Sequence, residues 1–314
     1  MSSSGEEPVI DIFIADSVTE MRRTLRGTLR TFNFESFEEF NDMDSLRRRL
    51  TNSYPDLMIV DVDLPGGDTC KMIQEIRTNL LGPNPFVPII MTSWDTDPKT
   101  IKRVIESGVD GLLLKPMSVS ALKRHLEVIM LERKPFLVTS SYIGPDRRTD
   151  ASHKSKVPLI DVPNTLKAKR LGQTVDLERL DRLIAENIRN VNDERLRRNA
   201  FEISFLLGLI LPAYEAEISD IQTRKQLNRI QVVAIDISER LVDTEFAHVS
   251  DLCQNLLTAT KSVAENFEQP PRKDFQLMKP LSDAILAAMN PDRPVSDMAG
   301  EISNSISNFQ NRQA

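Results

Sequence analysis

The chain has 314 residues, of which 40% are hydrophobic, so it can bury a sizeable core and is long enough for two domains. No apolar run reaches the roughly 20 residues of a membrane span, and the N-terminus lacks a signal-peptide pattern, so we expect a soluble, cytoplasmic protein without a membrane partner. The formal net charge of −6 is unevenly divided, because basic and acidic residues number 15 and 21 in residues 1–132, 9 and 3 in 133–175, and 16 and 22 in 176–314.

Short apolar runs alternate with helical patterns through residues 1–132. Residues 10–14, 57–60, 87–91 and 111–114 have the composition of buried strands, and Phe34 marks a further short strand. Each run precedes a segment with apolar residues at helical spacing. Five such units, joined by right-handed crossovers, predict an α/β domain with a five-stranded, doubly wound parallel sheet.

Four polar side chains lie at the predicted carboxyl ends of these strands. They are Asp16, Asp61, Ser93 and Lys115. Because ligands bind at the carboxyl edge of open α/β sheets, these side chains are candidates for a common site. A turn-forming role is the alternative for each of them taken alone.

The segment Ile14-Ala15-Asp16-Ser17-Val18-Thr19-Glu20-Met21-Arg22-Arg23 and the four ordered matches resemble the receiver domain of bacterial response regulators. The resemblance covers about residues 8–132 and implies a flavodoxin-like fold. It also implies that Asp61 accepts a phosphoryl group from a histidine kinase or phosphotransfer protein, that Asp16 belongs to a Mg²⁺ site, and that Ser93 and Lys115 contact the phosphoryl group.

The chemistry of phosphoryl transfer fits these residue types. A carboxylate that attacks a phosphoryl group needs its surrounding negative charge neutralised, which Mg²⁺ and an ammonium group can supply. Mg²⁺ prefers oxygen ligands, so Asp16, Asp61 and Asp63, the last through its backbone carbonyl or its side chain, are the predicted metal-binding set. Ser93 can donate a hydrogen bond once the phosphoryl group arrives.

Three positions depart from the family pattern. Ser17 stands where a second consecutive acid is usual, so we expect weak Mg²⁺ affinity. Leu112 stands where the family usually has an aromatic switch residue, so that side-chain flip cannot operate. Trp94, directly after Ser93, is either a replacement for this switch or a packing residue.

Residues 133–175 are rich in Pro, Gly, Ser and basic residues, which predicts a linker that could rest on acidic surfaces of its neighbours. Nucleic-acid binding by this segment is an alternative. The segment Tyr142 to Arg148 resembles a stretch found after receivers in some regulators, with no known activity to transfer.

Residues 176–314 carry helical patterns only, which predicts an all-α bundle for protein interaction or dimerisation. DNA binding is disfavoured by the acidic charge of this half. His248 could mark a phosphotransfer module and Glu301 with Asn304 a receiver phosphatase, but a surface histidine and a chance spacing are the simpler interpretations. Cys70 and Cys253 lack neighbours at metal spacing.

Together these features predict a phosphorelay response regulator that signals through a helical output. The only catalysis expected is phosphoacceptance by the receiver itself. The partner of the helical half, which could be a second copy of the chain, is not defined by the sequence.

Overall fold

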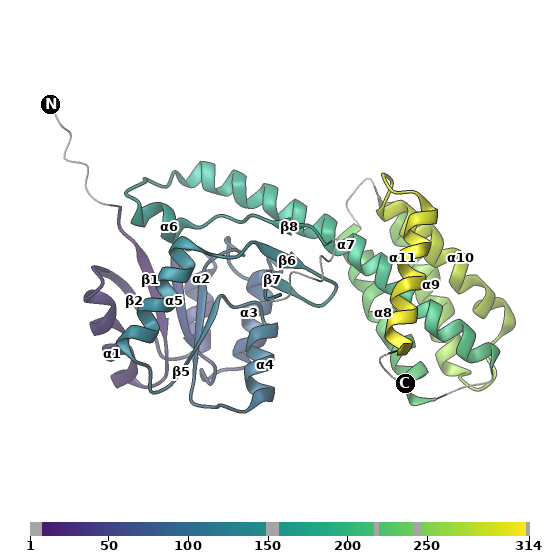
Figure 1. Cartoon of the computed structure of the whole chain (residues 1–314), viewed down its shortest axis with the longest axis horizontal. Helices are drawn as coiled ribbons and strands as arrows, with labels where there is room; N and C mark the ends of the chain where they lie inside the picture. The colour runs from purple at the N-terminus through teal and green to yellow at the C-terminus, as the bar shows by residue number, and fades with distance from the viewer. Residues whose placement is uncertain (1–7, 149–156, 217–219, 242–245, 312–314) are drawn as a thin grey trace. The chain divides into compact units, whose positions relative to one another are not determined.

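The computed structural model describes residues 8–148, 157–216, 220–241 and 246–311. The chain forms two compact units, Met1–Val191 (unit 1) and Asn192–Ala314 (unit 2). Unit 1 holds the predicted sheet, and unit 2 consists of helices (Figure 1). In the part of the chain that the structure describes, no helix has the length and apolar composition needed to cross a bilayer.

The main sheet of unit 1 is parallel, with strand order β2-β1-β3-β4-β5. Its strands are β1 (Asp11–Ala15), β2 (Ser36–Phe40), β3 (Leu57–Asp61), β4 (Ile89–Ser93) and β5 (Gly111–Leu114). β3 and β4 are buried along their whole length, because helices cover both faces of the sheet. The order reverses direction between β1 and β3, so the edge outside their carboxyl ends is a switch point where α/β folds bind ligands.

Helices cover the two faces of this sheet separately. α1 (Thr19–Arg30) and α5 (Val119–Leu131) pack on one face through a cluster that includes Leu25, Leu126 and Ile14. α2 (Met43–Leu50), α3 (Thr69–Arg77) and α4 (Pro98–Glu106) pack on the other face. This doubly wound sheet, followed by an all-helical region, confirms the predicted fold class.

Polar side chains fix the starts of the helices that follow the carboxyl edge of the sheet. Asp42, Asp68, Asp97 and Ser118 each accept a hydrogen bond from a backbone N–H in the first turn of α2, α3, α4 and α5. These caps hold the short loops that carry the candidate site.

The described part of residues 133–175 forms strands and a helix within unit 1, which differs from the linker that the sequence predicted. It contains β6 (Phe136–Val138), β7 (Ile143–Pro145), β8 (Leu159–Ile160) and α6 (Thr165–Arg170). β6 pairs antiparallel with β7 and β8. Phe136 and Val138 are fully buried, so a few apolar side chains anchor a segment whose overall composition is polar.

A buried ion network anchors β6. Asp110 accepts hydrogen bonds from Arg77 (3.1 Å) and Arg133 (2.7 Å), and both guanidinium groups lie over the ring of Phe136, at 5.2 and 5.3 Å from its centroid. Gly144 meets the loop after α4 so closely that a Cβ at this position would lie 2.7 Å from the Gly108 Cα. The Tyr142 to Arg148 segment therefore belongs to unit 1.

α7 (Leu177–Glu215) contributes to both units. In unit 1, its residues Leu180, Ile184 and Val191 pack with Phe136 and Ile143. In unit 2, the later part of α7 packs with α8 (Ile221–Leu241), α9 (Ala247–Glu265), α10 (Arg272–Met289) and α11 (Val295–Asn311). Their shared core is apolar and includes one hydroxyl pair, Ser204 with Ser282 at 2.7 Å.

Candidate functional site

The structure brings the four predicted side chains together at the carboxyl edge of the sheet. Asp16 follows β1, Asp61 ends β3, Ser93 ends β4 and Lys115 follows β5. Because the sequence predicts that Asp61 is a phosphoacceptor, we call these four residues the phosphoacceptor edge. All four are buried, with at most 6% of each residue exposed to solvent.

Lys115 bridges the two carboxylates. Its Nζ donates to Asp16 Oδ2 at 2.7 Å and lies 2.9 Å from Asp61 Oδ2. The cation thus offsets two negative charges that would otherwise repel each other in a poorly solvated place. The backbone N–H of Lys115 donates to Ser93 O at 2.7 Å, which continues the β4–β5 ladder and fixes the position of the Lys115 backbone.

Backbone contacts hold Asp16 in one orientation. Its Oδ1 accepts from Val18 N at 2.8 Å, and its backbone carbonyl accepts from Arg22 Nη1 at 2.6 Å. The same arginine pairs with Glu39 at the edge of the sheet, 3.3 Å away. Arg22 was not singled out from the sequence, because the six-residue spacing to Asp16 carries no motif.

One carboxylate oxygen of Asp61 is not used in a hydrogen bond with the described chain. Within the described chain, its Oδ1 is buried and finds no hydrogen-bond partner. Burial raises the pKa of Asp61 above its usual range, although hydrogen bonding and attraction by Lys115 act in the opposite direction. A buried, unpaired oxygen is costly unless something else satisfies it, which points to a cation or a reacting group at this position.

Ser93 faces the loop that leads into α4. Its Oγ accepts from Asp95 N at 3.0 Å and donates to Asp95 O at 3.2 Å. The Asp95 carboxylate in turn accepts from Asp97 N and from Thr100 Oγ1. Asp95 is a partner that sequence reasoning missed, although its place two residues after Ser93 is typical of a side-chain turn.

The predicted metal-binding set is only partly brought together. Asp16 and Asp61 share Lys115, whereas the side chain of Asp63 lies at the surface. No three His, Cys, Asp or Glu side chains in the described ranges are grouped so as to hold a metal ion. Asp61 Oδ1 still fits a hard cation, because it is a free carboxylate oxygen and Mg²⁺ keeps several waters.

The candidate residues of the helical half, His248, Glu301 and Asn304, belong to unit 2, whereas the four residues of this edge belong to unit 1. His248 is exposed in the first turn of α9, beside Phe246. Glu301 lies on α11 in an ion pair with Arg293 at 2.9 Å, and Asn304 is exposed on the same helix.

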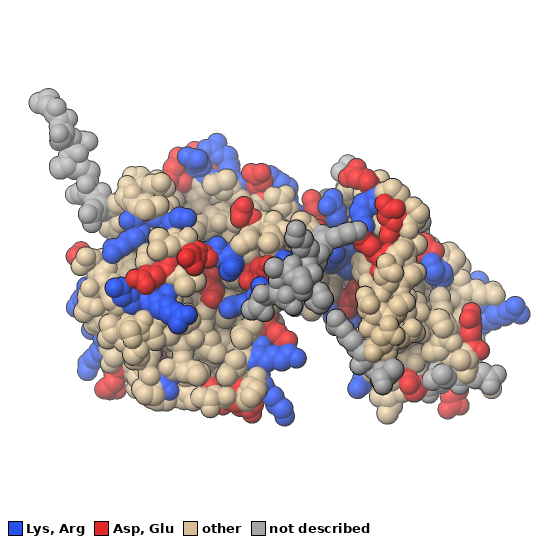
Figure 2. All heavy atoms as spheres, viewed as in Figure 1, with Lys and Arg blue, Asp and Glu red and all other residues tan. Residues whose placement is uncertain are grey.

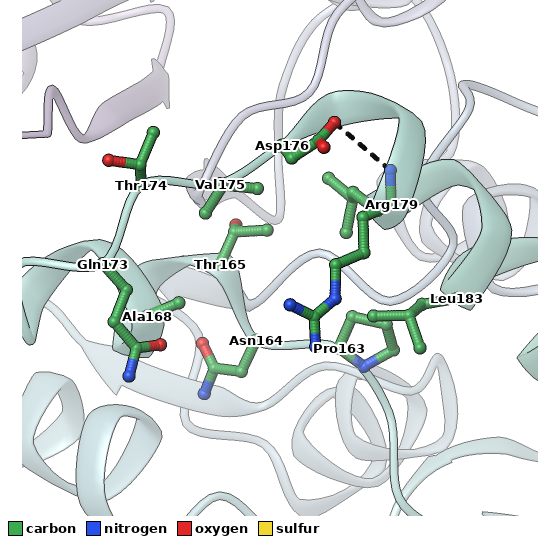
Figure 3. Close-up of a pocket in the computed structure, with 11 residues that line it drawn as sticks. Pro163, Asn164, Thr165, Ala168, Gln173, Thr174, Val175, Asp176, Arg179 and Leu183 are labelled. Atoms are coloured by element: carbon green, nitrogen blue, oxygen red, sulfur yellow. Dashed lines mark hydrogen bonds between the residues drawn. The ribbon is translucent and has the colours of Figure 1, made fainter.

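Unit 1 also has a shallow pocket of about 230 Å³ between α6 and the start of α7. Figure 3 shows the Arg179 side chain extending along it toward Asn164 and Pro163. None of the predicted site residues lines this pocket, so it is separate from the phosphoacceptor edge.

Comparison with known proteins identifies the first part of the chain. Residues 12–127 match the family model described as the response regulator receiver domain, and no family model matches the C-terminal half. Chemotaxis protein CheY-3 of Vibrio cholerae is 25% identical over 118 residues, which are 38% of this chain and 89% of that protein. The phosphate regulon transcriptional regulatory protein PhoB of Escherichia coli is 24% identical over 127 residues, 40% of this chain and 54% of PhoB.

Solved structures of other proteins match a similar share of the chain. RcsB of Salmonella enterica serovar Typhimurium, bound to promoter rprA in the presence of the phosphomimetic BeF₃⁻, has 22% sequence identity and a TM-score of 0.35. That match covers 39% of this chain and 69% of RcsB.

Proposed function

Residues 12–127 form the receiver domain of a response regulator, and from this premise we propose that Asp61 accepts a phosphoryl group from a histidine kinase or phosphotransfer protein of a phosphorelay. The observation that carries the proposal is the free, buried Oδ1 of Asp61 next to the ammonium of Lys115. We place this reaction in the cytoplasm.

The transfer is a substitution at phosphorus. An oxygen of the Asp61 carboxylate forms the new P–O bond, while the bond from phosphorus to the donor nitrogen or oxygen breaks and its electron pair leaves with the donor. Lys115 neutralises the phosphoryl oxygens, and burial keeps water from weakening this attraction. The product is an acyl phosphate on Asp61.

Mg²⁺ would supply further neutralisation of charge at this edge. Asp61 would hold the ion through its free oxygen. By the family pattern, Asp16 and the backbone carbonyl of Asp63 would supply further oxygen ligands. Since Ser17 is exposed and uncharged, this chain supplies one anionic ligand fewer than a site with two consecutive acids.

Incorporation of labelled phosphate from acetyl phosphate, in the presence of Mg²⁺, tests whether Asp61 is the phosphoacceptor. The parent protein should incorporate label, and Asp61→Asn should abolish it. Asp44→Asn is the matched control, because it removes an exposed carboxylate on α2 that belongs to no predicted site. Undiminished uptake by Asp61→Asn would refute the proposal.

The helical unit is proposed as a protein-interaction output, with a second copy of the chain as one candidate partner. Two of the three arginines clustered near its start support protein contact over nucleic-acid contact, because Arg195 pairs with Asp236 (3.0 Å) and Arg198 pairs with Glu194. Figure 2 shows blue and red side chains interspersed on the visible face of the chain, without one continuous basic surface.

Phosphotransfer or phosphatase activity of the helical half is the less favoured alternative, and phosphoacceptance is the only catalysis we propose. The pairing of Glu301 with Arg293 occupies the carboxylate that a phosphatase would use. Comparing the proteins that co-purify with parent and Asp61→Asn chains tests the output role.

A further inference from the structure

Trp94 lies over the ammonium group that completes the phosphoacceptor edge. The ring centroid of Trp94 is 5.9 Å from Lys115 Nζ, within the range of a cation–π interaction. The same Nζ contacts Asp16 and Asp61, so a carboxylate pair and an indole ring surround one cation. The Trp94 side chain is 56% exposed, so it covers the site from the solvent side rather than filling a core.

The hydrogen-bond ladder between β4 and β5 explains why Trp94 and Lys115 are neighbours. β4 and β5 pair with Ser93 opposite Leu114, and the backbone of Lys115 donates to Ser93 O. The residues that follow each strand, Trp94 and Lys115, therefore emerge side by side. A residue next to Ser93 is thereby also next to the cation.

Trp94 is also tied to the hydroxyl of Ser93 through the loop. Ser93 Oγ forms hydrogen bonds with the backbone N–H and the backbone carbonyl of Asp95, and Trp94 is the residue between them in the chain. If Ser93 turns its hydroxyl toward a phosphoryl group on Asp61, those bonds are lost and the backbone that carries the ring is released.

We propose that Trp94 is a positioning residue, which holds the Lys115 ammonium toward Asp61 in the unphosphorylated protein and leaves it when Ser93 turns toward the phosphoryl group. The inference rests on the proposed phosphorylation of Asp61. It gives this chain an aromatic response element directly after β4, whereas Leu112 provides none on β5.

Rates of phosphate uptake test the positioning role. Trp94→Leu keeps an apolar cover but removes the ring, and should slow uptake from acetyl phosphate about two- to fivefold, the effect of losing an exposed cation–π contact. Trp94→Phe keeps a ring and should remain within about twofold of the parent. Leu80→Ala, which removes an exposed apolar side chain elsewhere on unit 1, is the control and should match the parent.

Fluorescence tests the release of the ring, because Trp94 is the only tryptophan of the chain. BeF₃⁻ with Mg²⁺ should change its emission in the parent protein. The change should be lost in Ser93→Ala, which lacks the hydroxyl, and in Asp61→Asn, which lacks the acceptor.

The outcomes separate the two proposals. Absence of phosphate uptake in the parent would refute the proposed function. Normal uptake with an emission that does not respond to BeF₃⁻, or with Trp94→Leu as fast as the parent, would overturn the role of Trp94 and leave Asp61 as the acceptor.

Discussion

Lys115 holds two buried carboxylates at the edge of the sheet, and its side chain has no solvent-accessible surface. Asp16 and Asp61 were both predicted from the sequence, because each follows a short apolar run at a strand end. The contacts around them were not predictable. Arg22 and Asp95 reach the site through local turns, which residue spacing does not encode. Trp94 was named from its place after Ser93, but its contact with Lys115 depends on the ladder register.

Lys115→Met should destabilise the protein at neutral pH, because it leaves two buried carboxylates without their cation. We expect the free energy of unfolding to fall by about 2–4 kcal/mol. Repulsion and burial then raise the pKa of Asp61 further, so the folded state binds protons more tightly than the unfolded state. The deficit should therefore shrink as the pH falls.

Urea unfolding of parent and Lys115→Met at pH 7 and at about pH 5 measures this difference. Lys102→Met, in an exposed i,i+4 pair, is the control and should cost less than about 0.5 kcal/mol. A deficit that grows on acidification would contradict the role assigned to Lys115.

Ser17→Asp should tighten Mg²⁺ binding by about tenfold, since one added anionic charge close to the ion is worth on the order of 1 kcal/mol or more. Titration calorimetry gives the dissociation constant. Thr19→Asp adds an equal charge at an exposed position two residues further on, and should change binding much less. Equal effects of the two substitutions would show a general charge effect.

At the scale of elements, four of the five strands followed from apolar runs bounded by turns, whereas β2 (Ser36–Phe40) begins after the predicted Phe34 and is only partly buried. The secondary structure in the described part of residues 133–175 was not predicted. Pro, Gly and basic residues dominate that segment, and its anchoring depends on Arg77, Asp110, Arg133 and Phe136, which are far apart in sequence. Long-range pairs of this kind leave no periodic pattern. The segment that was predicted to be a linker therefore belongs to unit 1.

Phe136→Ala should destabilise unit 1 by about 3–5 kcal/mol, because it removes a fully buried ring and the surface on which Arg77 and Arg133 lie. Chemical unfolding of the full chain, followed by Trp94 emission, reports on this unit. Leu159→Ala on β8 removes a largely exposed side chain and should cost below about 1 kcal/mol. Equal, small effects would mean that β6 rests loosely on the receiver.

Unit 2 contains a polar cluster centred on Asp236. Arg195, Arg240 and Asn199 donate to its carboxylate at 2.7–3.1 Å. Burial tends to raise the pKa of Asp236, but hydrogen bonds and attraction from Arg240 and Arg195 outweigh it, so the pKa is lowered. This contribution to stability is present above the pKa of an unfolded Asp and is lost as the pH falls through the lowered pKa.

Asp236→Asn should therefore lower the free energy of unfolding of unit 2 by about 1–3 kcal/mol at neutral pH, and by less in acid. Far-ultraviolet circular dichroism during urea unfolding follows the helices. Asp283→Asn, in an exposed pair with Lys279, is the control and should have little effect. Equal losses at neutral and acid pH would argue against an ionic contribution from Asp236.

At the scale of the whole chain, the basic segment between two acidic ones is partly neutralised within unit 1. Lys169 pairs with Asp56 at 2.7 Å, Arg133 pairs with Asp110, and Arg147 donates to the carbonyl of Val109. Lys169 and Arg133 thus pair with buried acidic side chains of unit 1, whereas Arg148 pairs with Asp146 of the same segment, so the expectation that the connector rests on acidic surface stays a prediction. Lys154 and Lys156 belong to the same basic segment but lie outside the described residues. Self-association of the helical half stays a prediction.

The most direct test of the account is to locate the phosphoryl group itself. After incubation with acetyl phosphate and Mg²⁺, borohydride reduces an aspartyl phosphate to homoserine, and mass spectrometry of peptides identifies the modified position. The account predicts homoserine at position 61 in the parent and no modified Asp in Asp61→Asn. Modification of another Asp in the parent, with position 61 unchanged, would contradict it.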